Sequence, residues 1–318
     1  MTLKQKILVV GSLNMDMVID MVQMPAVGET VLGSSLTYNP GGKGANQACA
    51  AARLGGNVKM LGCVGNDEFG ELLKKNLSRC GVDVSDIKTG SKNTGLACIY
   101  VDSQGNNSIV VIPGANLECD VEYLKACDKA FQECDYLILQ MEIPKEAIYY
   151  AINRAKELSK TVILNPAPAP DEFPEDIFQK LDYITPNGTE LLKLGGGSGN
   201  TIEKYTQVAR KLVDKGVKNV LVTMGEKGAL LVSEKGAEIF PARKVTPIDT
   251  TAAGDCFNGA FLVALSEGMD HNKAVMFANA ASSIAVTRNG AQASIPDRNE
   301  TDEVLEDWIY KISKTSFE

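Results

Sequence analysis

Residues 249–261 place a carboxylate at the start of a predicted helix, directly after a run of small residues. Ala252, Ala253 and Gly254 allow successive backbone N–H groups to point at one spot, and the helix amino terminus adds partial positive charge. Asp255 could accept a proton from an attacking hydroxyl while these N–H groups hold charge on a phosphoryl group. An N-cap aspartate after a small-residue turn has the same pattern, so both interpretations stay open.

A second glycine-rich stretch, residues 39–46, also precedes a predicted helix. It is not a Walker phosphate loop, which requires Ser or Thr after the lysine where this chain has Gly44. Close backbone approach at Gly42, the charge of Lys43 and the amide of Asn46 suit a small ligand rich in hydroxyls. A tight turn with a helix cap is the alternative.

Polar side chains follow the ends of predicted strands. Asn14 and Asp16 lie on one face because they are two residues apart in an extended segment, so they could bind adjacent hydroxyls of a sugar. Glu142 also follows a strand and could join them. Turn or capping roles are the alternative for each residue.

Asn187 and Glu190 lie one helical turn apart after another predicted strand. Such a pair can organise water and Mg²⁺ around the phosphates of a nucleotide, or it can be an ordinary capping box. Residues 223–228 contain two glycines after a strand and could pass close to a nucleotide, although hairpin turns have the same pattern.

Composition excludes several other kinds of chemistry. The 318 residues include one histidine, His271, in a polar stretch that predicts a solvated loop, which argues against Ser/His/Asp hydrolysis and His-rich metal sites. The net charge is -8 and no basic run is present, so we expect neither nucleic acid nor membrane as a partner. Eight cysteines without a C-x-x-C pair are interpreted as reduced thiols of a cytoplasmic protein. The apolar run at residues 7–10 is too short for a signal peptide core.

The elements that must position these residues alternate between short apolar strands and longer amphipathic helices. This pattern predicts a mainly parallel sheet flanked by helices. The predicted strands are 7–10, 58–61, 136–140, 161–164, 183–185 and 220–223, and the predicted helices are 43–54, 67–80, 145–158, 202–215, 254–267 and 272–287. Residues 14–38 and 94–112 show two-residue alternation and predict a small antiparallel sheet. Because ligands bind at the carboxyl edge of open α/β sheets, we expect it to form a lid there, within a single α/β domain spanning residues 1–318.

In this order, the motifs resemble those of the PfkB group of carbohydrate kinases, and most closely its kinases of ribose. The resemblance covers nearly the whole chain and rests on residues 11–16, 41–46, 165–169, 187–190, 249–261 and 288–296. It implies a Rossmann-like α/β fold with a β-sheet lid, and a homodimer that pairs two lids. The implied reaction is ATP-dependent phosphorylation of D-ribose at its 5-hydroxyl, which gives D-ribose 5-phosphate.

The resemblance also implies roles for individual residues. Asp255 is similar to the base of the family, with its anion hole at Ala252, Ala253 and Gly254. The implied sugar contacts are Asn14, Asp16, Gly42, Lys43, Gly44, Ala45, Asn46 and Glu142. The implied ATP-side residues are Asn187, Thr223, Gly225, Glu226, Gly228, Gly254 and Asn279, with Glu190 organising Mg²⁺. A monovalent cation, usually K⁺, is implied at Asp249, Thr251, Ala285, Arg288, Gly290 and Ser294, several through backbone carbonyls.

Two other functions stay open. The acceptor could be another pentose, a ketohexose or a nucleoside, or the chain could be a sugar-binding regulator that kept the fold and lost turnover; the retained Asp255 argues against the regulator. The chain departs from the family pattern at Gly188, Cys256 and Asn279, where glutamate, threonine and histidine are frequent. Cys256 lies at a predicted helix amino terminus, which predicts a lowered thiol pKa and sensitivity to thiol reagents.

Overall fold

The computed structural model describes residues 5–315, and its centre is an eight-stranded sheet in the order β14-β13-β12-β11-β10-β9-β1-β4. The strands are β1 (Lys6–Val10), β4 (Asn57–Leu61), β9 (Tyr136–Leu139), β10 (Thr161–Leu164), β11 (Tyr183–Ile184), β12 (Asn219–Thr223), β13 (Ala229–Ser233) and β14 (Gly236–Phe240). Neighbours from β4 to β12 are parallel, whereas β13 and β14 pair antiparallel. The prediction of a mainly parallel α/β sheet is therefore confirmed.

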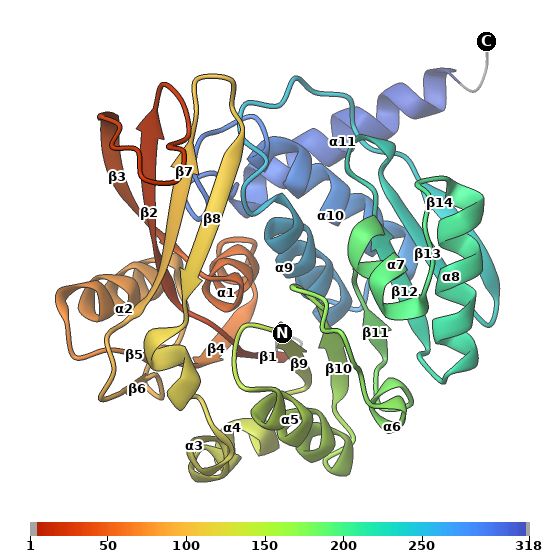
Figure 1. The fold of residues 1–318 in the computed structure, drawn as a ribbon. Helices are drawn as coiled ribbons and strands as arrows, with labels where there is room; N and C mark the ends of the chain where they lie inside the picture. The colour runs from red at the N-terminus through yellow and green to blue at the C-terminus, as the bar shows by residue number, and fades with distance from the viewer. Residues whose placement is uncertain (1–4, 316–318) are drawn as a thin grey trace.

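A separate four-stranded sheet in the order β3-β2-β7-β8 stands beside the large one (Figure 1). Its strands are β2 (Asn14–Met21), β3 (Gly33–Gly41), β7 (Gly95–Val101) and β8 (Asn107–Ile112), and a two-stranded pair joins β5 (Cys63–Val64) to β6 (Lys88–Thr89). Residues 14–38 and 94–112, which predicted a small antiparallel sheet, supply these strands. The pairs β2–β3 and β7–β8 are antiparallel as predicted, but the prediction is wrong for the central pair, since β2 and β7 run parallel. We refer to these four strands as the lid.

Helices cover both faces of the large sheet. The helices are α1 (Lys43–Arg53), α2 (Glu68–Cys80), α3 (Val121–Ala126), α4 (Asp128–Glu133), α5 (Lys145–Glu157), α6 (Glu175–Phe178), α7 (Gly188–Gly195), α8 (Ile202–Asp214), α9 (Ala253–Ser266), α10 (His271–Ala285) and α11 (Arg298–Thr315), with short 3₁₀ turns at Gly114–Glu118 and Gly225–Lys227. Alternate strand residues enter two separate cores, because successive side chains point to opposite faces. None of the helices within residues 5–315 is long and apolar enough to cross a membrane.

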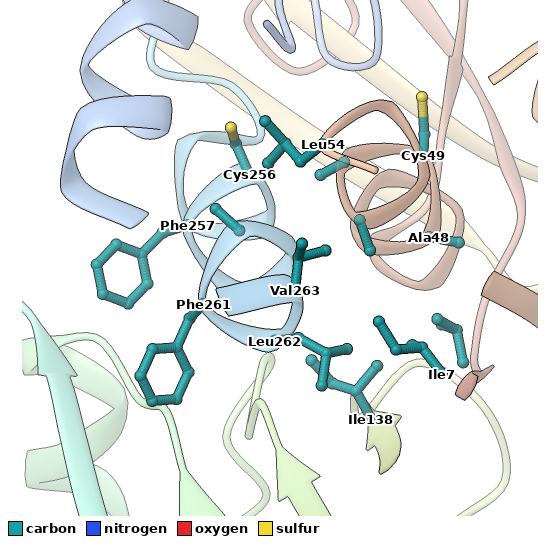
Figure 2. Packing of buried hydrophobic residues seen from close by; sticks show 14 of the residues in the cluster. Ile7, Ala48, Cys49, Leu54, Ile138, Cys256, Phe257, Phe261, Leu262 and Val263 are labelled. Atoms are coloured by element: carbon teal, nitrogen blue, oxygen red, sulfur yellow. The ribbon is translucent and has the colours of Figure 1, made fainter. Parts of the chain in front are cut away.

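The packing of α9 against α1 determines which residues meet at the carboxyl edge of the large sheet. Apart from its first residues α9 is apolar all round, which is typical of a helix buried between other elements. Figure 2 shows it beside α1, above Ile7 and Ile138 of the sheet. A Cβ atom on Gly259 would lie 2.6 Å from that of Ala50, so only glycine permits this approach. The first turns of the two helices are thereby brought together.

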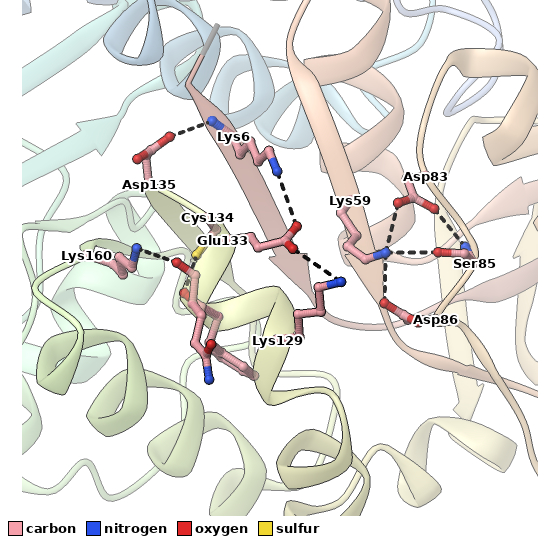
Figure 3. Close-up of polar contacts among 12 residues, drawn as sticks. Lys6, Lys59, Asp83, Ser85, Asp86, Lys129, Glu133, Cys134, Asp135 and Lys160 are labelled. Carbon is pink, nitrogen blue, oxygen red and sulfur yellow. Dashed lines mark hydrogen bonds and ion pairs between the residues drawn. The ribbon is translucent and has the colours of Figure 1, made fainter. Parts of the chain in front are cut away.

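Ion pairs lie on β1 and β4, away from the carboxyl edge of the large sheet (Figure 3). The backbone N–H of Lys6, at the start of β1, donates to Asp135 at 2.8 Å, and its ammonium pairs with Glu133 at 3.2 Å. Lys59 pairs with Asp83 at 2.8 Å and Asp86 at 2.7 Å. These groups are partly exposed and neutralise one another, so we interpret them as local ties between elements.

Two sequence-based predictions are wrong. His271 is not a loop residue: it begins α10, is half-buried, and its Nε2 lies 2.7 Å from the Tyr183 hydroxyl. Burial lowers its pKa, with a contribution from Lys235. Cys49 of α1 and Cys80 of α2 form a disulfide across a Cα separation of 5.4 Å, while the other six cysteines are free. The prediction of eight reduced thiols is therefore wrong. The cytoplasmic location stays a prediction.

Candidate active site

The start of α9 provides open backbone donors beside a carboxylate. Ala252 turns the chain with φ 57°, a left-handed value, and α9 begins at the next residue. The N–H of Ala253 donates to the Thr250 carbonyl at 3.2 Å. The N–H groups of Gly254 and Asp255 lie in the first turn, where a helix supplies no acceptor. A Cβ built on Gly254 would meet nothing within 4 Å, so the space on the side-chain side of this residue is open.

This geometry narrows the predicted anion hole. Ala252, Ala253 and Gly254 were expected to point their N–H groups at one spot, but the Ala253 N–H already has an acceptor. Ala252 contributes its left-handed conformation, which directs the chain into the helix. The donors available to an anion therefore include those of Gly254 and Asp255, and the Ala252 N–H also has no acceptor among the described residues. The positive end of the helix dipole adds to them.

Both oxygens of the Asp255 carboxylate accept from amides of α1. Asn46 Nδ2 donates to Oδ2 at 2.9 Å and Gln47 Nε2 donates to Oδ1 at 2.9 Å. Asn46 is itself oriented by Gln292, whose Nε2 donates to its Oδ1 at 3.1 Å. All of these side chains are buried. Asp255 is therefore a tightly held carboxylate next to two open N–H groups, and it does not act as an N-cap because α9 begins two residues earlier.

The lid contributes Asn14 and Asp16. Asn14 Oδ1 accepts from Asn116 Nδ2 at 2.7 Å, which leaves the Asn14 amide nitrogen for another acceptor. A Cβ on Gly41 would overlap the Asp16 carboxylate, so glycine is required where β3 passes this side chain. Burial raises the pKa of Asp16 to about 7, and the nearby charges of Glu142 and Asp255 add to the shift.

Lys43 is the cation among these acids. Burial alone would lower its pKa, but the charges of Asp255, Glu142, Glu190 and Asp16 raise it instead. It lies at the first position of α1, after Gly42 with φ 89°. A Cβ on Gly42 would lie within 3 Å of the backbone at residues 12–14, which explains the glycine. The positive charge of Lys43 thus offsets part of the negative charge of the carboxylates around it.

The other predicted sugar contacts surround the start of α1. Glu142 Oε2 accepts from the Ser12 hydroxyl at 2.6 Å and from the Lys43 N–H at 3.2 Å. Gly44 and Ala45 are buried and donate their N–H groups to the side chain and carbonyl of Ser12, respectively. These bonds tie the first turn of α1 to the segment that follows β1. Gly44 and Ala45 shape the floor of the site, while Glu142 is half-buried at its side.

Most of the predicted nucleotide residues lie at the start of α7 and in the turn after β12, whereas Asn279 lies on α10. Asn187 and Glu190 form a capping box at the start of α7, with both bonds at 2.9 Å, and Asn187 bridges to Thr223. Burial raises the pKa of Glu190, opposed by the Asn187 N–H and by Lys43. Gly225, Glu226 and Gly228 form the turn after Thr223. Asn279 of α10 instead donates to the Pro241 carbonyl at 3.1 Å.

Of the six residues predicted to hold a monovalent cation, three are brought together by hydrogen bonds at Asp249. Asp249 accepts from the N–H of Thr251 at 2.8 Å and from the N–H of Gly290 at 2.9 Å. Burial acts to raise its pKa, but these hydrogen bonds lower it overall, so Asp249 is a carboxylate. Of the others, Ala285 is buried, Arg288 pairs with Glu300, and the Ser294 hydroxyl donates to the Ala291 carbonyl at 2.8 Å.

The prediction of a reactive Cys256 is wrong. Its side chain has no exposed surface, and burial raises its thiol pKa to about 12, with the Asp255 charge adding to the shift. The residue lies at a helix start but faces the core (Figure 2). A reagent would have to open α9 to reach this thiol.

Several polar residues at the site had no predicted role: Ser12, Gln47, Asn116, Gln140, Thr185, Asn258 and Gln292. Through buried and part-buried hydrogen bonds they hold the predicted residues, or one another, in place. The available signal was their position, because Gln47 follows Asn46 directly and Gln140 and Thr185 follow strand ends. Apart from the bond of Asn258 to the Gly254 carbonyl, four residues away, their partners lie far away in the chain, which no local pattern reveals.

The comparisons with known proteins agree with this geometry. Residues 4–298 match the model of the pfkB family of carbohydrate kinases, which is most of the chain. The chain belongs to this family. Among curated relatives, the ribokinase of Haemophilus influenzae is 40% identical over 96% of this chain and 99% of its own, and the deoxyribokinase of Salmonella typhi is 38% identical over 94% and 98%. The sequence-based identification of a PfkB carbohydrate kinase is thus confirmed.

Solved structures of family members superpose closely on this chain. The ribokinase of Thermotoga maritima has a TM-score of 0.87 at 42% identity and covers 95% of this chain and 99% of its own. The ribokinase of Arabidopsis thaliana, solved with ribose and ATP, has a TM-score of 0.90 at 32% identity with the same coverage. The Rossmann-like fold with a separate small sheet is that of these structures.

Proposed function

We propose that this PfkB family member transfers the γ-phosphoryl group of ATP to the 5-hydroxyl of D-ribose, which gives D-ribose 5-phosphate. The observation that carries the proposal is the Asp255 carboxylate, held by Asn46 and Gln47 beside the open N–H groups at the start of α9. The ribokinases among its relatives, including one solved with ribose and ATP, support this choice of acceptor and donor.

Each group has a task that follows from its chemistry. Asp255 accepts the hydroxyl proton as the oxygen attacks phosphorus, and the N–H groups of Gly254 and Asp255 stabilise charge on the transferred group. Asn14, Asp16 and Asn46 orient the sugar, because amides and carboxylates pair with hydroxyls. Phosphoryl transfer depends mainly on positioning and charge stabilisation, so one held carboxylate suffices as base. Lys43 offsets the negative charge of the surrounding acids.

The family also implies Mg²⁺ and K⁺. Within residues 5–315, no group of three or more His, Cys, Asp or Glu side chains is arranged to hold a metal ion. Glu190 keeps one carboxylate oxygen beyond the capping box, which fits water-mediated contact with Mg²⁺ on a nucleotide. Bound Mg²⁺ would neutralise phosphate charge. Asp249 is bonded to the N–H of Gly290 in the second segment, and its carboxylate with backbone carbonyls of the two segments would supply the oxygen ligands that K⁺ prefers. Bound K⁺ would support the start of α9.

Pairing of two lids in a homodimer is part of the proposal. Cross-strand pairing places Ile109 and Val111 of β8 on the lid face that carries Asp16. They are 54% and 47% exposed, unusually high for large apolar side chains on adjacent positions of one face. A second lid packed on this face would cover them and close the sugar side of the site.

The testing experiment is a coupled ADP-release assay with ATP and Mg²⁺ across D-ribose, 2-deoxyribose, fructose and adenosine, with K⁺ present or replaced by Na⁺. K⁺-stimulated turnover on ribose supports the proposal together with its cation site. Turnover on 2-deoxyribose alone would move the acceptor toward that of the deoxyribokinase relative while keeping the mechanism. Ribose binding without turnover on any acceptor would favour a regulator that lost catalysis.

A further inference from the structure

A chain of buried hydrogen bonds runs from the Asp255 carboxylate into the carboxyl edge of the sheet. Gln47 Nε2 uses both of its hydrogens: one bonds Asp255 Oδ1 at 2.9 Å and the other bonds Asn165 Oδ1 at 3.0 Å. Asn165 Nδ2 then donates to the Thr185 carbonyl at 2.8 Å. Gln47 has no exposed surface and Asn165 is 6% exposed, so neither bond competes strongly with water.

The chain then returns to the helix from which it started. The Thr185 hydroxyl donates to Asn258 Oδ1 at 2.6 Å, and Asn258 Nδ2 donates to the Gly254 carbonyl at 2.8 Å. Gly254 precedes Asp255, so the bonds close a ring through α1, the ends of β10 and β11, and α9. The ring joins the base to the residue that provides an open N–H group.

The groups at both ends of this hydrogen-bond chain determine which amide atoms donate and which accept. The Thr185 carbonyl and the Asp255 carboxylate can only accept, so Asn165 and Gln47 must turn their NH₂ groups toward them. Gln47 Oε1 then faces away and accepts from Gln140 Nε2 at 2.6 Å. Gln140 Oε1 is left without a hydrogen-bond partner among the described residues, although Gln140 has no exposed surface.

An unpaired buried oxygen costs about 1–3 kcal/mol, and an apolar residue in place of Gln140 would avoid that cost. The oxygen lies where Gly11 has no Cβ, since a Cβ there would overlap it. A cost of this kind in an otherwise satisfied network is typical of functional sites, where orientation matters more than stability. Gln140 can do one thing that an apolar residue cannot, which is to donate to Gln47 and hold its orientation.

We infer that Gln47 is a positioning residue for phosphoryl transfer: its amide, oriented by Gln140 and Asn165, holds the Asp255 carboxylate toward the acceptor hydroxyl. The inference rests on the proposed function, in which Asp255 is the base. Gln47 acts only through Asp255, because it is fully buried and both hydrogens of its amide are already bonded. Its loss should therefore lower kcat and leave sugar binding nearly unchanged.

The test compares three variants with the parent protein by steady-state kinetics, sugar binding and thermal unfolding. Gln47→Leu keeps side-chain size and removes the donor, and we expect kcat to fall about 30-fold or more with the sugar KM within about threefold. Asn219→Leu is the control, because it likewise removes a side-chain amide donor, here the one bonded to the Asp182 carbonyl at 3.0 Å, away from the site. Its kcat should equal that of the parent.

The third variant, Gln47→Glu, keeps the shape of the side chain and changes only its ability to donate a hydrogen bond to Asp255. A protonated carboxyl at this position donates to Asp255 as the amide does, whereas an ionised one repels it. The ratio of variant to parent kcat should therefore fall at least about tenfold from about pH 6 to about pH 9. The charged groups that also act on Asp255 are Lys43, Asp16 and Glu190, and division by the parent value removes their common effect.

Three results would overturn the inference: a Gln47→Leu kcat within about threefold of the parent, an equal loss in Asn219→Leu, or a Gln47→Glu ratio that does not change with pH. The kinetics are measured on ribose or 2-deoxyribose, whichever the parent phosphorylates. An error in the proposed acceptor therefore leaves this test intact. A parent protein that phosphorylates neither sugar would overturn the proposed function and the inference that depends on it.

Discussion

Asn46 Nδ2 and Asp255 Oδ2 are 2.9 Å apart, although 209 positions separate the two residues in the chain. Asn46 lies in the first turn of α1, which follows β3 of the lid, and Asp255 lies in the first turn of α9, at the centre of the fold (Figure 1). A predicted sugar contact is thus bonded directly to the predicted base. In the proposed function, sugar binding by Asn46 and proton transfer to Asp255 would therefore occur at one hydrogen-bonded unit.

Replacement of Asp255 by alanine should remove most turnover. We expect Asp255→Ala to lower kcat by about 10³-fold, since a positioned base contributes about 10²–10⁴, while ribose affinity changes little. Initial rates and calorimetric ribose titration measure the two effects. Asp120→Ala is the control, because Asp120 caps α3 through the Tyr123 N–H. It should cost about 1 kcal/mol of stability and no activity. Near-normal turnover in Asp255→Ala would refute the assignment.

Ribose affinity should depend on pH near neutrality because of Asp16. Its pKa is raised to about 7 by burial and by neighbouring acids. Sugar hydroxyls donate hydrogen bonds best to the ionised carboxylate, so ribose binding should release protons near pH 7 and weaken as the pH falls below it. Calorimetry in buffers of different ionisation enthalpy measures the release. Equal heats in all buffers at pH 7 would contradict this role.

The same group should reduce stability as the pH rises. The pKa of Asp16 in the folded protein lies above the ordinary value of 3.8, so the fold favours the protonated form. Its contribution to the free energy of unfolding is fully present below about pH 4 and is lost as the pH rises through about 7. Asp16→Asn should therefore raise the melting temperature above pH 7, with less gain at pH 4. A gain independent of pH would point to another cause.

The cysteine arrangement predicts a definite thiol count. Denatured protein without reductant should react at six thiols, and at eight after reduction, since Cys49 and Cys80 are paired. The pair closes a separation of 31 residues, so Cys80→Ser should lower the free energy of unfolding by about 2–4 kcal/mol. Cys127→Ser, at a free cysteine, is the control. Eight reactive thiols before reduction would show that the bond does not form in solution.

Lid pairing should depend on the apolar face of β8. A charge at Ile109 would be buried without a partner in a lid-to-lid interface, so Ile109→Glu should produce monomers from a parent dimer. Light scattering after gel filtration measures the mass. Ile239→Glu is the matched control, because Ile239 of β14 is 50% exposed against 54% for Ile109 but lies on the large sheet. A parent protein that is monomeric at all concentrations would contradict the homodimer.

Much of the site could be predicted from local patterns. The helix that begins at Ala253 follows a small-residue turn, and the capping box of Asn187 and Glu190 spans three residues. Such signals depend on hydrogen bonds within one turn, so the residues concerned are neighbours in the chain. The carboxyl-edge location of Asp16 and Glu142 followed from the alternation of strands and helices.

The sequence by itself determined the parallel part of the sheet, the lid segments and the starts of α1, α2, α5, α8, α9 and α10, because periodicity and capping act over a few residues. The order of its motifs indicated the family. Only the tertiary structure decided that Gln47 bonds Asp255, that Cys49 meets Cys80, and that His271 packs on Tyr183. The partners in these pairs come from different elements, and their meeting depends on strand order and on which helix faces pack together. The raised pKa of Asp16 has the same origin, since burial is a property of the whole fold.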